Sequence, residues 1–220
     1  MNKLNDCGVL ALSYVDEDTD CVVDEIIFSP KNRHMIAEII DSDVIYNYQS
    51  YELSQEESEL IVSANNLSSP PKYSFGRLSL KNRNNILTYM THSGRELMLM
   101  LSGEKPLAVF SDSLIDFSDN YSKKEKLFDH YVSKGVFLKS AAVINKGEVG
   151  DIRFILYANP DEAWRMKSYI LLQKTHVKCG WNDCLERMEG ALLGYSDAQN
   201  DEWLENRKKN PPAIISMLLR

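Results

Sequence analysis

The chain has 220 residues, of which 44% are hydrophobic and 26% charged, and its formal net charge is −7. The hydrophobic content excludes a chain that is too polar to fold. The excess of acidic residues argues against a general grip on nucleic-acid phosphates, so we expect no direct nucleic-acid partner.

The start of the chain and its cysteines indicate a cytoplasmic protein. Residues 1–6 are polar and lack the basic and apolar segments of a secretion signal. No apolar run reaches the roughly 18 residues that cross a bilayer, so we expect no membrane partner. Cys7, Cys21, Cys179 and Cys184 are then expected as reduced thiols.

In chain order, the first predicted elements are strands. Residues 9–15 and 21–28 are rich in apolar residues and are separated by an acidic turn, which predicts a β-hairpin. Aromatic residues alternate with other residues along residues 44–53, and this alternation predicts a further strand.

A helix is predicted next, over residues 55–66. Ser54 and Glu57 have the spacing of a capping box, in which each side chain bonds the backbone amide of the other residue. The polar, proline-bearing segment 68–72 ends this helix and is a possible subdomain boundary.

The middle of the chain is predicted to be mainly helical. Residues 79–102 have an apolar pattern of helical type. Residues 107–110 resemble a short buried strand, residues 111–122 a polar loop, and residues 123–134 a short amphipathic helix.

The most regular stretch follows, and it predicts a central hairpin over about residues 136–158. Two apolar segments, 136–144 and 150–158, flank a turn that contains Asn145 and Gly147. The first segment is apolar at nearly every position, so we expect it to be the central strand of the sheet.

A helix is predicted directly after this hairpin. Asn159 is a suitable N-cap and Pro160 a suitable first helical residue. Ala163, Met166 and Ile170 recur at helical spacing, and we expect them to form its buried stripe.

The C-terminal part is predicted to be an αα-hairpin. Its first helix ends at Gly194, and its second begins after Ser196 and extends to about Lys209. A short apolar tail follows at residues 213–219. The stripe expected to be buried on the first helix is Cys184, Leu185, Met188, Ala191 and Leu192.

These elements predict the α+β class, with an antiparallel sheet and its central hairpin packed against helices. We expect a single domain over residues 1–220, with a possible division into residues 1–69 and 73–220.

One cluster has residue types that bind metals. His176, Cys179 and Cys184 are close in sequence. Zinc needs three or four such ligands, so a fourth would have to come from elsewhere in the chain, and Cys184 lies on the predicted apolar stripe. We therefore expect no metal and no cofactor.

The preferred functional hypothesis is a binding module that acts by occluding a protein partner with a basic surface, as inhibitors, immunity proteins and counter-defence proteins do. The sequence lacks the common nucleotide-binding, zinc-protease and hydrolase motifs. A nucleic-acid mimic is a special case, which requires the acids at 16–25, 111–119 and 197–205 to share one face. The candidate binding residues are Trp164, Trp181, Tyr195, Trp203, Asp197, Asp201 and Glu202.

The alternative is an enzyme whose active site is assembled from scattered residues, such as a transferase or hydrolase acting on a nucleotide-like ligand. Glu162 and Arg165 lie at the start of the helix after the hairpin, where pockets often form. Lys105 and His130 complete the candidate catalytic set.

Overall fold

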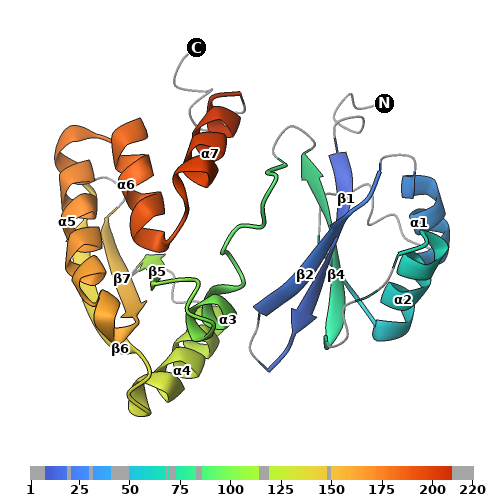
Figure 1. The fold of residues 1–220 in the computed structure, drawn as a ribbon, viewed down its shortest axis with the longest axis horizontal. Helices are drawn as coiled ribbons and strands as arrows, with labels where there is room; N and C mark the ends of the chain where they lie inside the picture. The colour runs from blue at the N-terminus through green and yellow to red at the C-terminus, as the bar shows by residue number, and fades with distance from the viewer. Residues whose placement is uncertain are drawn as a thin grey trace. The chain divides into compact units, whose positions relative to one another are not determined.

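The computed structural model describes residues 8–18, 21–29, 32–40, 50–67, 69, 73–82, 86–113, 119–147 and 150–209. The chain divides into two compact units, a first unit of residues 1–95 and 205–220 and a second unit of residues 96–204. Both units combine antiparallel strands with helices, which confirms the predicted α+β class (Figure 1).

The first unit holds a sheet whose described strands have the order β2-β1-β4-β3. Helices α1 and α2 supply Ile36 and Ile61 to a core that includes Leu12, Tyr14 and Leu78 of the sheet. The elements are β1 (Gly8–Asp16), β2 (Cys21–Ile27), α1 (Arg33–Ile40), β3 (Tyr51–Leu53), α2 (Gln55–Ala64) and β4 (Phe75–Asn82).

Two predictions for this unit are confirmed. β1 and β2 form the expected antiparallel hairpin. Helix α2 begins with the expected capping box, because the Glu57 amide donates to Ser54 Oγ at 3.2 Å and the Ser54 amide donates to Glu57 Oε2 at 2.7 Å.

The helix predicted over residues 79–102 is wrong for most of its length. Its first residues, 79–82, belong to strand β4 and pair with β1, where Ser79 lies opposite Ala11. Strand pairing with β1 outweighs the local helical pattern. The only helix there within the described residues is α3 (Glu96–Leu101), which begins after Gly94 at φ 74°.

Several predictions fall on residues outside the described ranges. The boundary near 68–72 lies mostly there, within the residues assigned to the first unit, so it stays a prediction. Most of the strand expected at 44–53 and the apolar tail at 213–219 also lie there.

The second unit holds a sheet whose described strands have the order β5-β7-β6. After α3, its elements are β5 (Leu107–Ser113), α4 (Asp119–Ser133), β6 (Leu138–Asn145), β7 (Asp151–Ala158), a 3-10 turn (Pro160–Glu162), α5 (Trp164–Cys179), α6 (Asp183–Leu193) and α7 (Asp197–Lys209), whose last residues, 205–209, belong to the first unit.

The central hairpin is confirmed, because β6 and β7 pair antiparallel over their whole lengths. The expectation that its first strand is central is wrong, since β7 lies between β5 and β6. Leu138 and Val143 of β6 remain 40% and 54% exposed, whereas residues 154–158 of β7 are all buried. Apolar content alone could not separate the edge strand from the middle one.

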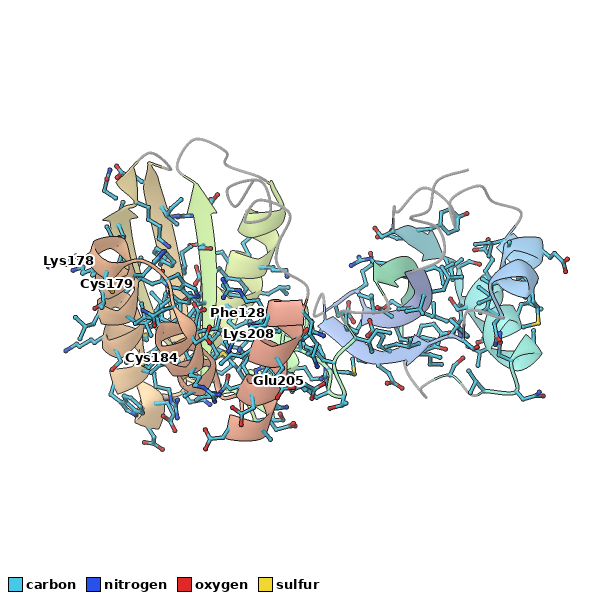
Figure 2. The ribbon with its side chains drawn as sticks, turned by 90° about the horizontal axis from the view of Figure 1, so that it is seen from above. Phe128, Lys178, Cys179, Cys184, Glu205 and Lys208 are labelled. Atoms are coloured by element: carbon cyan, nitrogen blue, oxygen red, sulfur yellow. The ribbon has the colours of Figure 1, made fainter. Side chains whose placement is uncertain are left out.

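Helices cover both faces of this sheet. Phe154 and Leu156 of β7 pack with Tyr169 of α5 and Leu185 of α6 on one face. On the other face, Phe128 of α4 contacts Tyr157 of β7 with ring centroids 4.7 Å apart, and Figure 2 shows Phe128 lying between α4 and the sheet.

The segments at 111–122 and 159–163 also differ from expectation. Residues 111–113 continue β5 and residues 119–122 begin α4, so the described part of the expected loop is strand and helix. Asn159 makes no capping bond, since its side-chain amide donates to the Lys105 carbonyl at 3.5 Å, and a 3-10 turn precedes α5.

The C-terminal αα-hairpin is confirmed. α6 ends at Gly194 with φ 93°, and α7 starts with a capping box between Ser196 and Gln199. No helix in the described part of the chain combines the length and the apolar character that a membrane span requires.

Candidate functional site

Helix α5 buries a face that is shifted from the one its spacing predicts. Tyr169, Leu172 and Gln173 are its buried residues, while Met166 and Ile170 of the predicted stripe are only partly buried. The helix carries apolar residues almost all round, so a 3.6-residue period does not single out one face. Trp164 and Leu171 are consequently left on the surface.

The predicted stripe of α6 is only half used as core. Leu185 and Leu192 are buried against the sheet, whereas Cys184, Met188 and Ala191 are exposed. The apolar stripe is wider than the contact with the sheet requires.

These uncovered residues of α5 and α6 form one groove, with a cavity volume of about 640 Å³. The two helices are joined by a short connection and lie side by side (Figure 1). The groove is lined from α5 by Trp164, Arg165, Ser168, Leu171, Leu172 and Thr175, and from α6 by Leu185, Met188, Ala191 and Leu192.

Three large apolar side chains in this groove are at least half exposed: Trp164 at 55%, Leu171 at 66% and Met188 at 50%. A single exposed apolar residue is ordinary on a soluble protein, but neighbouring ones in a groove mark an interaction site. They come from both walls of the groove.

A smaller hollow of about 300 Å³ lies next to the groove, between α5 and the end of β6, where Ile144 and Asn145 line it. Leu171 and Thr175 line both hollows, and Val177 and Lys178 extend the smaller one toward the C-terminus of α5. Figure 2 shows Lys178 at the outer edge of the second unit.

Arg165 fixes one end of the groove. Its Nε donates to Glu162 Oε2 at 2.6 Å, and its Nη1 donates to the carbonyls of Ala191 at 2.7 Å and Leu192 at 3.2 Å. Its guanidinium also lies 4.8 Å from the ring centroid of Trp164. Arg165 therefore ties the start of α5 to the end of α6 and holds Trp164 beside the groove.

Lys105 approaches the same helix end. It is 3% exposed, and its Nζ donates to the Leu193 carbonyl at 3.3 Å. Burial lowers the pKa of Lys105 to about 8, although the nearby carboxylate of Glu96 acts in the opposite direction. A cation at this position suits the negative end of the α6 dipole.

The candidate catalytic residues are thus only partly brought together. Glu162, Arg165 and Lys105 all lie near the last turn of α6, where the two cations satisfy its carbonyls. His130 lies exposed on α4 with its ring 5.3 Å from that of Tyr131, and among the described residues it makes no contact with the other three.

A buried polar cluster that sequence reasoning missed joins α5 to α6. Glu189 Oε1 accepts from the Tyr169 hydroxyl at 2.6 Å and from Gln173 Nε2 at 3.2 Å. Lys146 Nζ donates to Gln173 Oε1 at 2.9 Å. Burial raises the pKa of Glu189, and the hydrogen bond from Tyr169 reduces that rise. No pattern in the sequence marks this cluster, because α5 and α6 carry many other polar residues.

The predicted aromatic binding residues lie at three places in the second unit. Trp164 borders the groove, and Tyr195 lies with its ring 5.9 Å from Lys105 Nζ. Trp181 and Trp203 both donate from Nε1 to the carboxylate of Glu186, Trp203 at 2.8 Å. This shared acceptor places those two indoles together.

The predicted acidic residues lie on α7. Asp201 forms an ion pair with Arg187 of α6. Asp197 is exposed in the first turn, and Glu202 is partly buried. A continuous row of unpaired carboxylates is therefore absent from this described part of α7.

A second charged cluster lies on the α4 face of the sheet. Lys139 Nζ donates to Glu125 and Asp129 at 2.8 Å each, and the Tyr157 hydroxyl donates to Asp129 at 3.0 Å. Burial would lower the pKa of Lys139, but its bonds to the two carboxylates outweigh burial and raise it. Lys139, Glu125, Asp129 and Tyr157 are therefore hydrogen-bonded to one another, as in a structural network.

Metal-ligating residues do not gather in the described residues, where no group of three or more His, Cys, Asp or Glu could hold an ion. The ring of His176 instead packs edge-on against Trp181 at 4.8 Å. Cys179 and Cys184 are exposed.

No protein-family model, curated protein or solved structure matches the chain. The function is therefore argued from the residues of the site.

Proposed function

We propose that the chain is a protein-binding module of the cytoplasm that occludes a partner through the groove between α5 and α6. The observation that carries the proposal is the exposure of Trp164, Leu171 and Met188 on its two walls. Tryptophan and methionine are enriched where proteins meet, and contiguous apolar surface is rarely left uncovered.

Burial of these side chains would supply the driving force for association. Fully burying one large apolar side chain contributes about 1.5–3 kcal/mol. Three such side chains give a favourable core for an interface, from which the loss of translational freedom and the ordering of side chains are subtracted. Trp164, held by Arg165, has less freedom to lose than an unrestrained side chain.

The polar groups of the groove support binding rather than chemistry. The Ser168 hydroxyl donates to the Trp164 carbonyl at 3.1 Å, and the Thr175 hydroxyl donates to the Leu171 carbonyl at 2.9 Å. Both hydroxyls are therefore bonded to the backbone of α5. Arg165 is bonded to α6, so the lining offers no nucleophile beside a general base.

The basic partner surface expected from the net charge stays a prediction. Asp197 is the exposed acid on α7 that such a surface would meet, because Asp201 already pairs with Arg187. The hypothesis of a nucleic-acid mimic requires exposed acids at 111–119. Asp112 does not meet this requirement, since it is 9% exposed and faces Arg153 at 3.8 Å.

Affinity capture from a lysate of the native host tests the proposal. The tagged full chain is compared with Leu171→Asp and Met188→Asp in the groove. Leu60→Asp is the matched control, since Leu60 is 51% exposed on α2 in the first unit. We expect a stoichiometric protein with the wild type and the control, and its loss with both groove variants.

Retention of that protein by the groove variants would contradict the proposal, as would the absence of any stoichiometric protein. Circular dichroism of each variant shows whether it is folded. Because both groove side chains are already exposed, we expect little change in stability.

A further inference from the structure

The outer rim of the groove on α5 is basic, in a chain with a net charge of −7. Lys167, Lys174 and Lys178 are exposed and lie on the same side of the helix as Leu171. No ion pair between these lysines and another described residue is found in the structure. The rim on α6 differs, since its cation Arg187 is already paired with Asp201.

From this asymmetry we infer that the groove binds an amphipathic helix of the partner protein, with acidic residues along the flank that faces α5. The inference rests on the proposed function and specifies the partner of that same site. A groove between two adjacent helices accepts a third helix, whose apolar residues at i, i+3, i+4 and i+7 enter it.

The dimensions of the groove fit such a helix. Its lining on α5 extends from Trp164 to Thr175, a rise over eleven residues that corresponds to roughly 16 Å at 1.5 Å per residue. About three turns of partner helix would cover that length. Trp164 would pack at one end of the helix and Thr175 at the other.

The three lysines on the rim favour acidic residues on the flank of the partner helix that faces α5. Glutamate or aspartate facing Lys167, Lys174 and Lys178 would be attracted, whereas lysine or arginine there would be repelled. Each exposed pair acts weakly, but three together give a preference of roughly tenfold that declines as salt screens it.

An anionic membrane surface is the other class that apolar and basic residues attract. The groove favours the helix, because its apolar side chains line a hollow between two helices and do not project from one convex face. Vesicles therefore serve as an arm of the test.

A displayed library of 18-residue helical peptides tests the inference on the full chain. The library fixes leucine, isoleucine, phenylalanine and methionine on one face and varies Glu, Lys, Gln and Ser on the two flanks. Selection is run on the wild type, on Leu171→Asp, and on the triple variant K167Q/K174Q/K178Q. Sedimentation with vesicles of phosphatidylserine and phosphatidylcholine is measured in parallel.

We expect peptides that bind the wild type and not Leu171→Asp, with glutamate enriched on one flank. The triple variant should lose this enrichment and still select peptides. Exchanging Glu for Lys in a selected peptide should weaken binding to the wild type about tenfold at low salt, and less at high salt.

Three results would overturn the inference. Groove-dependent peptides with neutral or basic flanks would contradict an acidic helix as the ligand but would remain consistent with a protein-binding module. Failure to select any groove-dependent peptide would contradict the helix as ligand, whereas the proposed function fails if lysate capture finds no stoichiometric protein or is insensitive to Leu171→Asp. Vesicle binding that Leu171→Asp and the triple variant both abolish would replace the helix with a membrane.

Discussion

At the scale of single residues, Lys105 shows how burial of a charge is offset. Its ammonium lies in the interior, where it would be destabilising alone. The Leu193 carbonyl and the end of the α6 dipole partly compensate for the lost hydration. The sequence identified Lys105 as a residue of interest, but not as a group that holds α6.

The lowered pKa of Lys105 predicts how stability depends on pH. The folded pKa is about 8 against an ordinary value of 10.5, so between these two values the unfolded chain holds more protons. The free energy of unfolding should therefore rise with pH across this interval, by up to roughly 3 kcal/mol. Urea denaturation of the wild type and Lys105→Met at pH 7.5 and 10 measures the difference. Parallel pH dependence of the two proteins would contradict the prediction.

Glu189 should act with the opposite sign. Its folded pKa is raised, mainly by burial, so its contribution is complete below the unfolded pKa of roughly 4.3 and is lost as pH rises through the folded value. Glu189→Gln keeps an acceptor for Tyr169 and removes the charge. We expect this variant to gain stability over the wild type between pH 4 and pH 7 in denaturant titrations. A constant difference between the two would show that Glu189 titrates normally.

At the scale of elements, local signals predicted where helices begin better than which face they bury. The capping boxes at Ser54 and Ser196 bond neighbouring backbone groups, so four residues of sequence contain the whole interaction. The burial of α5 depends instead on how the whole helix packs against β7 and α6, which no four-residue motif contains. The apolar residues of α5 outside the predicted buried stripe, Trp164 and Leu171, are the feature of the sequence that indicates the groove.

The contact between α6 and α7 requires a glycine. A Cβ on Gly190 would lie 2.8 Å from Cγ of Asn200, and both residues are buried. Gly190→Ala gains helix propensity of about 1 kcal/mol, but we expect overpacking to exceed it and to destabilise the second unit by roughly 1–2 kcal/mol. Asn200→Ala should relieve the clash, so the double variant should be more stable than the sum of the single effects. Additive effects in thermal unfolding would exclude this contact.

At the scale of the whole molecule, the chain divides into two compact units. The single domain with a possible boundary near 68–72 stays a prediction. Pairing of β4 with β1 joins the residues on either side of that segment in one sheet. Long-range strand pairing of this kind leaves no local trace in the sequence.

The two units should unfold separately, and the tryptophans allow this to be measured. All three, Trp164, Trp181 and Trp203, belong to the second unit. Gly76→Ala should destabilise the first unit, because a Cβ there would lie 2.9 Å from Leu12 Cδ1. We expect this variant to lower the midpoint of one unfolding transition in far-ultraviolet circular dichroism and to leave the midpoint of the tryptophan fluorescence transition unchanged. An equal shift of both signals would show that the units unfold together.

We propose that the groove between α5 and α6 binds a protein. The most direct test is the affinity of the purified captured partner for the wild type, for Leu171→Asp and for Leu60→Asp, measured by isothermal titration calorimetry. We expect Leu171→Asp to weaken binding at least roughly 30-fold, the scale of an interface hot spot, and Leu60→Asp to leave it unchanged. Equal affinities of the wild type and Leu171→Asp would contradict the claim.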